Sequence, residues 1–391
     1  MPGRGGPACP AAPAGLGAGP AEDPAVTAAP GAAEAALGLR DQALAALDAG
    51  DPRAALALAE GGLAALSGPG LAGGPDEAAV LAARAEIEEA LDRHGEAAAT
   101  IAAAIGLLGG DAGPGEHDGD LLWLWCQAQE RQAGLERLAG DYRAAATRLT
   151  MVLDTAAGAF GEASAAVVSA ANALGVVGKY AGDFTAAEAA YQRALAAAGR
   201  LGGAGALMRA GLLHNLGGLA HSRGDAGAGI PVAEEGLALR AGALGVAHPD
   251  VARDLNALGA LYHLAGRYAD AGHAYQRALM VFEDSYGPDH FETAQACANL
   301  AVLHGDQGHF RAAEALGRRA LRILEDVLGP GDADVGLTLL NLVPAIAGQG
   351  RRAEAVTVAA RAGQILADRL PAGHPHIQAA RNALDHLRGT S

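Results

Sequence analysis

Glycine recurs every 42 residues along most of this chain, and this spacing constrains the fold more than any other feature of the sequence. Steps of 42 from Gly266 lead to glycine at each position reached in the same register. These positions are Gly140, Gly182, Gly224, Gly308 and Gly350. A fixed period of this length, kept without a slip, indicates stacked copies of one supersecondary unit.

A second series of residues keeps the same register. Leucine lies eight residues before all but the first of these glycines, and a further step of 42 reaches Leu384. The series is Leu174, Leu216, Leu258, Leu300 and Leu342. Upstream the step lengthens to 45, which joins Gly140 to Gly95 and Gly95 to Gly50. We therefore expect about seven or eight repeats, of which the first two rest only on alanine-rich periodicity.

Each repeat is predicted to be a pair of antiparallel helices that meet at the glycine. In the clearest copy, DVARDLNALGALYHLA (250–265) precedes the glycine and YADAGHAYQRALMVFED (268–284) follows it. A left-handed backbone is needed where the first helix stops, and glycine tolerates it best. An aromatic residue two positions later and a small residue five positions later let the second helix pack closely on the first. Tyr268 and Tyr275 are therefore expected to be packing residues.

Composition agrees with an all-α protein. Hydrophobic residues make up 51% of the chain and aromatic residues 4%, and the apolar fraction consists mainly of alanine and leucine. Residues 1–33 are rich in proline, alanine and glycine and predict a disordered tail. Residues 34–110 are expected to form degenerate helical repeats, and residues 119–391 a regular array with a C-terminal capping helix.

Two repeats depart from the pattern. After Gly224, the residues Gly227, Gly229 and Pro231 stand where the second helix should begin, so that helix is expected to start late or to be loose. Pro344 falls inside the first helix of the last repeat, so the end of the array is expected to be less regular.

Charge and motifs narrow the classes of function. The formal net charge is −16, with 28 basic and 44 acidic residues, which disfavours nucleic acid and anionic membranes as partners. Three cysteines without CxxC spacing suggest neither a disulfide framework nor a zinc site, and a reducing cytoplasm fits them. No signal peptide or membrane span is recognised. No nucleophile, acid–base or metal motif stands out, so we expect no enzymatic activity, no cofactor and no metal.

At this point the residues resemble a known family. The leucine followed by a small residue, the G-[DRH]-[YF] corner and the alanine–leucine late in the second helix resemble tetratricopeptide repeats, specifically the 42-residue kinesin-light-chain-like type. HPDVARDLNALGALYHLAGRYADAGHAYQRAL (248–279) is the clearest copy. The resemblance implies a right-handed superhelical solenoid whose first helices line a concave side that receives peptides or protein surfaces.

The predicted binding residues follow from this resemblance. Asparagines at or beside the concave stripe could hold an extended peptide backbone, or they could instead bond to a neighbouring helix and stiffen the array. His221 and His263 share one register position and are expected to face the same groove. The predicted peptide-binding set is Asn215, Asn256, Asn299, Asn341, Arg253, Gln295, His221 and His263.

The sequence therefore predicts a non-enzymatic scaffold that binds a protein or peptide segment. The alternative is a regulatory sensor whose array changes curvature near Pro231 when a small molecule or signalling peptide binds. A separately encoded ATPase, protease or regulator is a further candidate partner.

Overall fold

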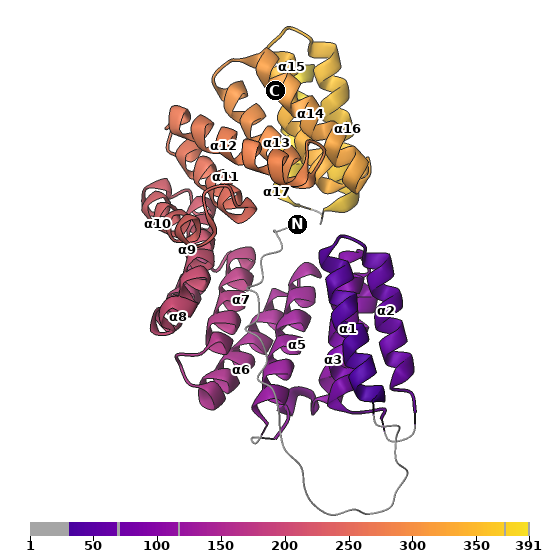
Figure 1. Cartoon of the computed structure of the whole chain (residues 1–391). Coiled ribbons are helices and arrows are strands. Elements are labelled where there is room, and N and C mark those ends of the chain that lie inside the picture. Colours follow the sequence, from indigo (N-terminus) through magenta and orange to yellow (C-terminus); the bar gives the residue numbers. More distant parts are fainter. Residues whose placement is uncertain (1–30, 69–70, 116–117, 371–372, 390–391) are drawn as a thin grey trace, which may run out of the picture. The chain divides into compact units, whose positions relative to one another are not determined.

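The computed structural model describes residues 31–68, 71–115, 118–370 and 373–389. Within these ranges the secondary structure consists of α-helices and two short 3-10 helices, without a strand (Figure 1). The predicted all-α fold of stacked antiparallel helix pairs is confirmed. Most of the predicted N-terminal tail, residues 1–30, lies outside the described residues.

The helices belong to two compact units that divide between Met208 and Arg209. In the described residues, α1 to α16 form consecutive helix pairs and α17 follows the last pair. The N-terminal unit contains α1 (Ala32–Asp48), α2 (Pro52–Ala65), α3 (Pro75–Ala90), α4 (His94–Leu107), α5 (Gly119–Leu138), α6 (Tyr142–Phe160), α7 (Ala165–Ala181) and α8 (Phe184–Arg200), with the 3-10 helices η1 (Gly110–Ala112) and η2 (Gly202–Gly205). The C-terminal unit contains nearly all of α9 (Ala206–Ser222), then α10 (Ala226–Leu244), α11 (Pro249–Leu264), α12 (Tyr268–Tyr286), α13 (Phe291–Asp306), α14 (Phe310–Leu328), α15 (Ala333–Ala347), α16 (Arg352–Arg369) and α17 (Pro375–Arg388).

The corner of each regular pair lies at the periodic glycine. Gly266, between α11 and α12, has φ 72°, in the left-handed region that glycine adopts without strain. The 45-residue step upstream gave one wrong corner, because Gly95 lies inside α4. The left-handed residue of that turn is Asp92, with φ 60°, and aspartate is one of the few other residues that tolerate this conformation.

The second helix after Gly224 does not start late, so that part of the prediction is wrong. α10 begins at Ala226, directly after Asp225, whose carboxylate accepts a hydrogen bond of 3.0 Å from the Ala228 amide. Gly229 is a packing glycine, since a Cβ there would lie 2.6 Å from Leu261 and 2.9 Å from Ala220. The missing side chain thus lets α10 approach α9 and α11 closely.

The last pair is also more regular than expected. α15 continues through Pro344 to Ala347, held by the buried side chains of Val343 and Ile346 on either side of the proline. Arg352 donates from Nε to the Leu387 carbonyl and so joins the start of α16 to the end of α17. The C-terminal helix closes the apolar face of this pair.

Histidines are the N-cap residues of α11, α13 and α17. His290 accepts a hydrogen bond on Nδ1 from the Glu292 amide at 3.2 Å and so caps α13. His248 caps α11 and His374 caps α17 in the same way. Burial, the largest cause, lowers the pKa of His290, and a neutral ring is the form that can accept this bond.

Glu130 in the N-terminal unit is a buried carboxyl group whose pKa is raised. Glu130 on α5 accepts a hydrogen bond of 2.5 Å from the Ser169 hydroxyl on α7. Burial raises the pKa of Glu130 to about 7, against a smaller lowering by the Ser169 hydroxyl. The folded chain therefore holds this proton more tightly than the unfolded chain does.

Stability is expected to fall as the pH rises through this range. Between pH 4.5, the ordinary value for a glutamate, and about 7, the folded state binds more protons than the unfolded state, so the free energy of unfolding decreases with pH. The Glu130→Gln variant should remove this pH dependence, which amounts to about 3 kcal/mol of unfolding free energy across the range. Urea unfolding of parent and variant at several pH values measures it, with exposed Glu60→Gln as the matched control. An identical pH profile for parent and Glu130→Gln would show that the carboxyl is not perturbed.

Candidate functional site

A polar groove of about 470 Å³ lies in the C-terminal unit. Residues of α9, α11 and α13, which are first helices of three successive pairs, form it together with two tyrosines of α12. Its lining consists of His221, Ala260, His263, Leu264, Tyr268, Tyr275, Asn299, Val302 and Asp306. We refer to it as the His263 groove.

The polar centre of the groove is a side-chain contact between α11 and α13. His263 Nε2 lies 2.8 Å from Asp306 Oδ2, and the imidazole is 17% exposed whereas the carboxylate is 56% exposed. The Tyr268 ring meets the His263 ring edge-on, with centroids 5.6 Å apart. The histidine is thereby fixed in orientation, while the carboxylate stays open to solvent.

A pair of side-chain amides lies along the same first helices. Asn299 on α13 donates from Nδ2 to Asn256 Oδ1 on α11 at 3.0 Å. This bond uses one group of each amide and leaves the Asn299 carbonyl and the Asn256 amino group without a hydrogen bond among the described residues. An acceptor and a donor are the two groups that an extended peptide backbone requires.

The helical register explains why these residues meet. His263 and Asp306 are 43 positions apart, and so are Asn256 and Asn299. A spacing of one repeat length plus one residue thus brings side chains of neighbouring first helices into contact. The repeat period of 42 aligns equivalent residues, whereas the contact between His263 and Asp306 follows the spacing of 43.

The groove brings together three of the eight predicted binding residues, namely His221, His263 and Asn299. Asn256 contacts the groove's Asn299 from outside the lining. The other four, which are Asn215, Asn341, Arg253 and Gln295, lie outside this lining. Their role in binding stays a prediction.

Arg253 is engaged in contacts within the array. It donates to Asp250, to Glu292 Oε1 at 2.7 Å and to the Tyr286 hydroxyl at 3.1 Å. These partners lie on α11, α13 and α12 respectively. Arg253 therefore ties three helices together, a structural contribution that the sequence did not reveal.

The two tyrosines of the clearest repeat have different roles. Tyr275 is 2% exposed and packs as predicted, whereas Tyr268 is 40% exposed and lines the groove. At the equivalent corner of the next pair, Phe310 lies on Gly348, where a Cβ would be 2.5 Å from its ring. Asp306 occupies the position equivalent to Gly348 for Tyr268. The larger side chain there leaves the tyrosine at the surface, so the prediction of a packing role is wrong for Tyr268.

Other chemistry is limited in the part of the chain that the structure describes. No three histidine, cysteine or acidic side chains there come close enough to hold a metal ion. Burial raises the pKa of Cys126 to about 12 and also raises that of Cys297, which keeps both thiols protonated at neutral pH. No helix among the described residues has the length and apolar character that a membrane crossing requires.

A comparison with family models identifies the repeat. The tetratricopeptide repeat model matches residues 208–279 and 262–326, a span that contains every residue of the His263 groove. Residues 208–326 are tetratricopeptide repeats. The resemblance predicted from the corner glycines is thus confirmed, and the groove lies within the matched tetratricopeptide repeats.

Solved structures share this tetratricopeptide repeat fold. BtubC (BKLC) from P. vanneervenii is 24% identical, with a TM-score of 0.50 and a match over 62% of this chain and 92% of that chain. RapI in its apo form is 12% identical, with a TM-score of 0.54 over 80% of this chain and 86% of that chain. A Rap protein complexed with Competence and Sporulation Factor is 12% identical, with a TM-score of 0.51 over 92% and 98%. None of the curated proteins matches the sequence.

Proposed function

We propose that this protein is a scaffold that binds a peptide or protein segment in the His263 groove. The observation that carries the proposal is the convergence of His221, His263 and Asn299 on one solvent-accessible groove. Tetratricopeptide repeats are typical of protein interaction scaffolds, and a Rap protein of this fold is complexed with Competence and Sporulation Factor. The groove supplies the contacts that such an interaction needs.

The charge of the groove favours a neutral or basic segment. Asp306 places a half-exposed carboxylate at its edge, and the whole chain carries a formal net charge of −16. An acidic segment would meet repulsion from both, whereas lysine or arginine could pair with Asp306. The Asn256–Asn299 pair would hold the backbone of the segment without reading its side chains.

The alternative of a curvature-changing sensor rests on α10. Pro231 has no amide hydrogen, so the Gly227 carbonyl lacks its partner in the helix. The close approach of α10 at Gly229 to α9 and α11 opposes a loose segment there. We therefore favour the scaffold, with the sensor as the second candidate.

A random peptide display library offered to the full chain tests the proposal. Selected peptides are expected to be neutral or basic. Their affinity should fall at least about tenfold in Asn299→Ala, because a buried backbone group of the peptide then loses its partner. Asp306→Asn should weaken basic peptides selectively.

The matched control is His273→Ala, an exposed histidine on α12 outside the groove lining. It should leave peptide affinity unchanged. Peptides that bind parent, Asn299→Ala and Asp306→Asn equally would show that the groove is not the binding site, provided that the urea midpoints of these variants match the parent.

A further inference from the structure

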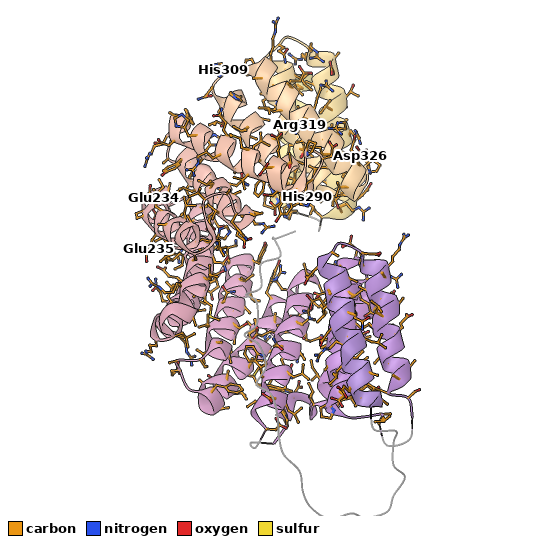
Figure 2. The ribbon with its side chains drawn as sticks, in the orientation of Figure 1. Glu234, Glu235, His290, His309, Arg319 and Asp326 are labelled. Carbon is orange, nitrogen blue, oxygen red and sulfur yellow. The ribbon has the colours of Figure 1, made fainter. Side chains whose placement is uncertain are left out.

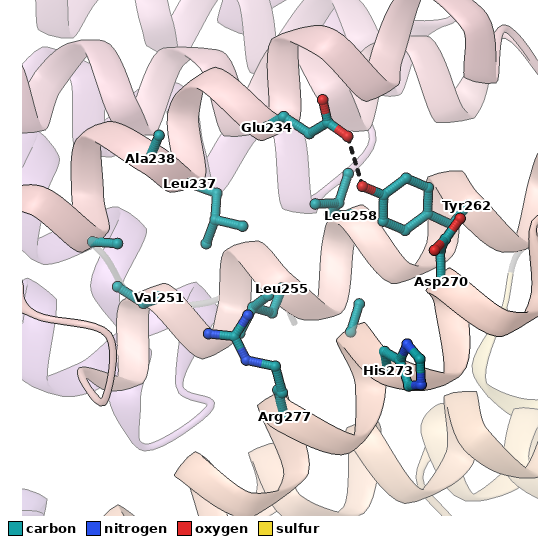
Figure 3. Close-up of a pocket in the computed structure, with 12 residues that line it drawn as sticks. Glu234, Leu237, Ala238, Val251, Leu255, Leu258, Tyr262, Asp270, His273 and Arg277 are labelled. Atoms are coloured by element: carbon teal, nitrogen blue, oxygen red, sulfur yellow. Dashed lines mark hydrogen bonds between the residues drawn. The ribbon is translucent and has the colours of Figure 1, made fainter.

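A second pocket of about 390 Å³ lies in the C-terminal unit, formed by α10, α11 and α12 (Figure 3). It shares no residue with the His263 groove. Its floor is apolar, and charged or polar side chains stand on the two second helices. The lining consists of Glu234, Leu237, Ala238, Ala241, Val251, Leu255, Leu258, Tyr262, Asp270, His273, Ala274 and Arg277.

Two alanines leave space in this pocket, whereas larger side chains occupy the equivalent positions of the next pair. Ala274 on α12 corresponds to Leu316 on α14, which packs against the buried core. Ala241 on α10 corresponds to Glu283 on α12, which pairs with an arginine of the following second helix. The pocket therefore lies where Ala241 and Ala274 take the place of the larger side chains of the next pair.

The alanine at position 241 also leaves an arginine without the partner that its equivalents have in the next two pairs. Arg319 on α14 pairs with Glu283 at 2.6 Å and Arg361 on α16 pairs with Glu325 at 2.5 Å, each reaching back to the preceding second helix. Figure 2 labels Arg319 at this position. Arg277 holds the same register, but Ala241 stands where the carboxylate should be. Among the described residues Arg277 has neither a hydrogen bond nor an ion pair.

The two carboxylates of the pocket are already engaged. Glu234 accepts a hydrogen bond of 2.6 Å from the Tyr262 hydroxyl, and Asp270 pairs with Arg267 at 2.7 Å. Burial first, and then the bond to Glu234, raise the pKa of Tyr262 to about 12, so the hydroxyl remains a donor. Figure 3 shows the Arg277 guanidinium on the side of Val251 and Leu255, away from Tyr262 and Glu234.

We propose that this pocket binds an aliphatic carboxylate. The carboxylate replaces the missing acidic partner and pairs with the Arg277 guanidinium in a bidentate geometry that arginine favours. The hydrocarbon chain covers Leu237, Leu255 and Leu258, whose apolar surfaces line the pocket. A pocket of this volume, with an apolar floor and a few placed polar groups, is typical of small-molecule sites.

Octanoate is the probe, titrated into the full chain and followed by calorimetry and by chemical-shift changes. Saturable binding is expected, and octanol and octylamine should bind at least about tenfold more weakly, because neither can pair with the guanidinium. Arg277→Gln should weaken octanoate at least about tenfold. Arg322→Gln, which removes an exposed arginine of α14, is the matched control and should have no effect.

The decisive variant is Ala241→Glu. It places a carboxylate at the position from which Glu283 and Glu325 reach the next arginine, so it should pair with Arg277 and abolish octanoate binding. Its urea midpoint should equal or exceed that of the parent, and peptide binding in the His263 groove should be unchanged. Absence of saturable octanoate binding, equal affinity for octanoate and octanol, or full octanoate binding by Ala241→Glu would each overturn the proposal.

Discussion

Tyr275→Ala is expected to lower the free energy of unfolding of the C-terminal unit by about 3–5 kcal/mol. The ring is 2% exposed and belongs to a core cluster with Leu300 and Leu303. It lies directly on Gly259 of α11, where a Cβ would be only 2.7 Å from the ring carbons. Removal of the ring leaves a cavity beside a glycine, and the backbone of two packed helices cannot collapse to fill it.

The contact with Gly259 allows a sharper test, because the effect of Gly259→Ala on stability should change sign when the Tyr275 ring is removed. In the parent, Gly259→Ala should destabilise by about 1 kcal/mol, because overpacking against the ring outweighs the gain in helix propensity. In the Tyr275→Ala background the space is empty, so the same substitution should stabilise by up to about 1 kcal/mol.

The matched control is Gly211→Ala on α9. Its Cβ would meet no atom within 4 Å, so it should stabilise both backgrounds by about 0.5–1 kcal/mol. Urea unfolding of the four combinations gives the coupling energy. If Gly259→Ala had the same effect with and without the Tyr275 ring, the ring would not determine the requirement for glycine.

The fold could be predicted because one register governs it. Corner glycines such as Gly266 and leucines such as Leu258 mark the same height of each pair, and the structure uses them in that way. Where the sequence left the register, the prediction failed. The 45-residue step placed a corner at Gly95, although Asp92 makes the turn. When a repeat is longer than 42 residues, its sequence does not indicate where the extra residues are inserted.

The candidate site was less predictable, because it depends on contacts between neighbouring helices. Asn256, Asn299 and His263 were predicted from their positions in the repeat. The contacts Asn256–Asn299 and His263–Asp306 instead follow a spacing of one period plus one residue. The apolar pocket shows the converse. It lies where small residues replace larger side chains of the next pair, such as Ala241 in place of Glu283, and a search for agreement between copies passes over such positions.

A buried carboxylate gives the second large expected effect. Asp254 on α11 is 4% exposed and accepts hydrogen bonds from Arg240 Nε of α10 at 2.7 Å and from the His214 ring of α9 at 2.8 Å. Alanine and threonine, Ala296 and Thr338, occupy the equivalent buried position in the next two pairs. A charge at this position is tolerated only because two other helices supply its partners.

Asp254→Ala should therefore lower the free energy of unfolding by about 3–5 kcal/mol, because Arg240 is left largely buried without a counter-charge. Asp326→Ala is the matched control, since its pair with Arg322 is exposed and 3.7 Å long, and it should cost less than about 1 kcal/mol. Replacing Asp254, Arg240 and His214 together with leucine should recover most of the loss, because no unpaired charge then remains buried. Equal urea midpoints for Asp254→Ala and Asp326→Ala would show that the three-helix ion pair adds no more than a surface contact.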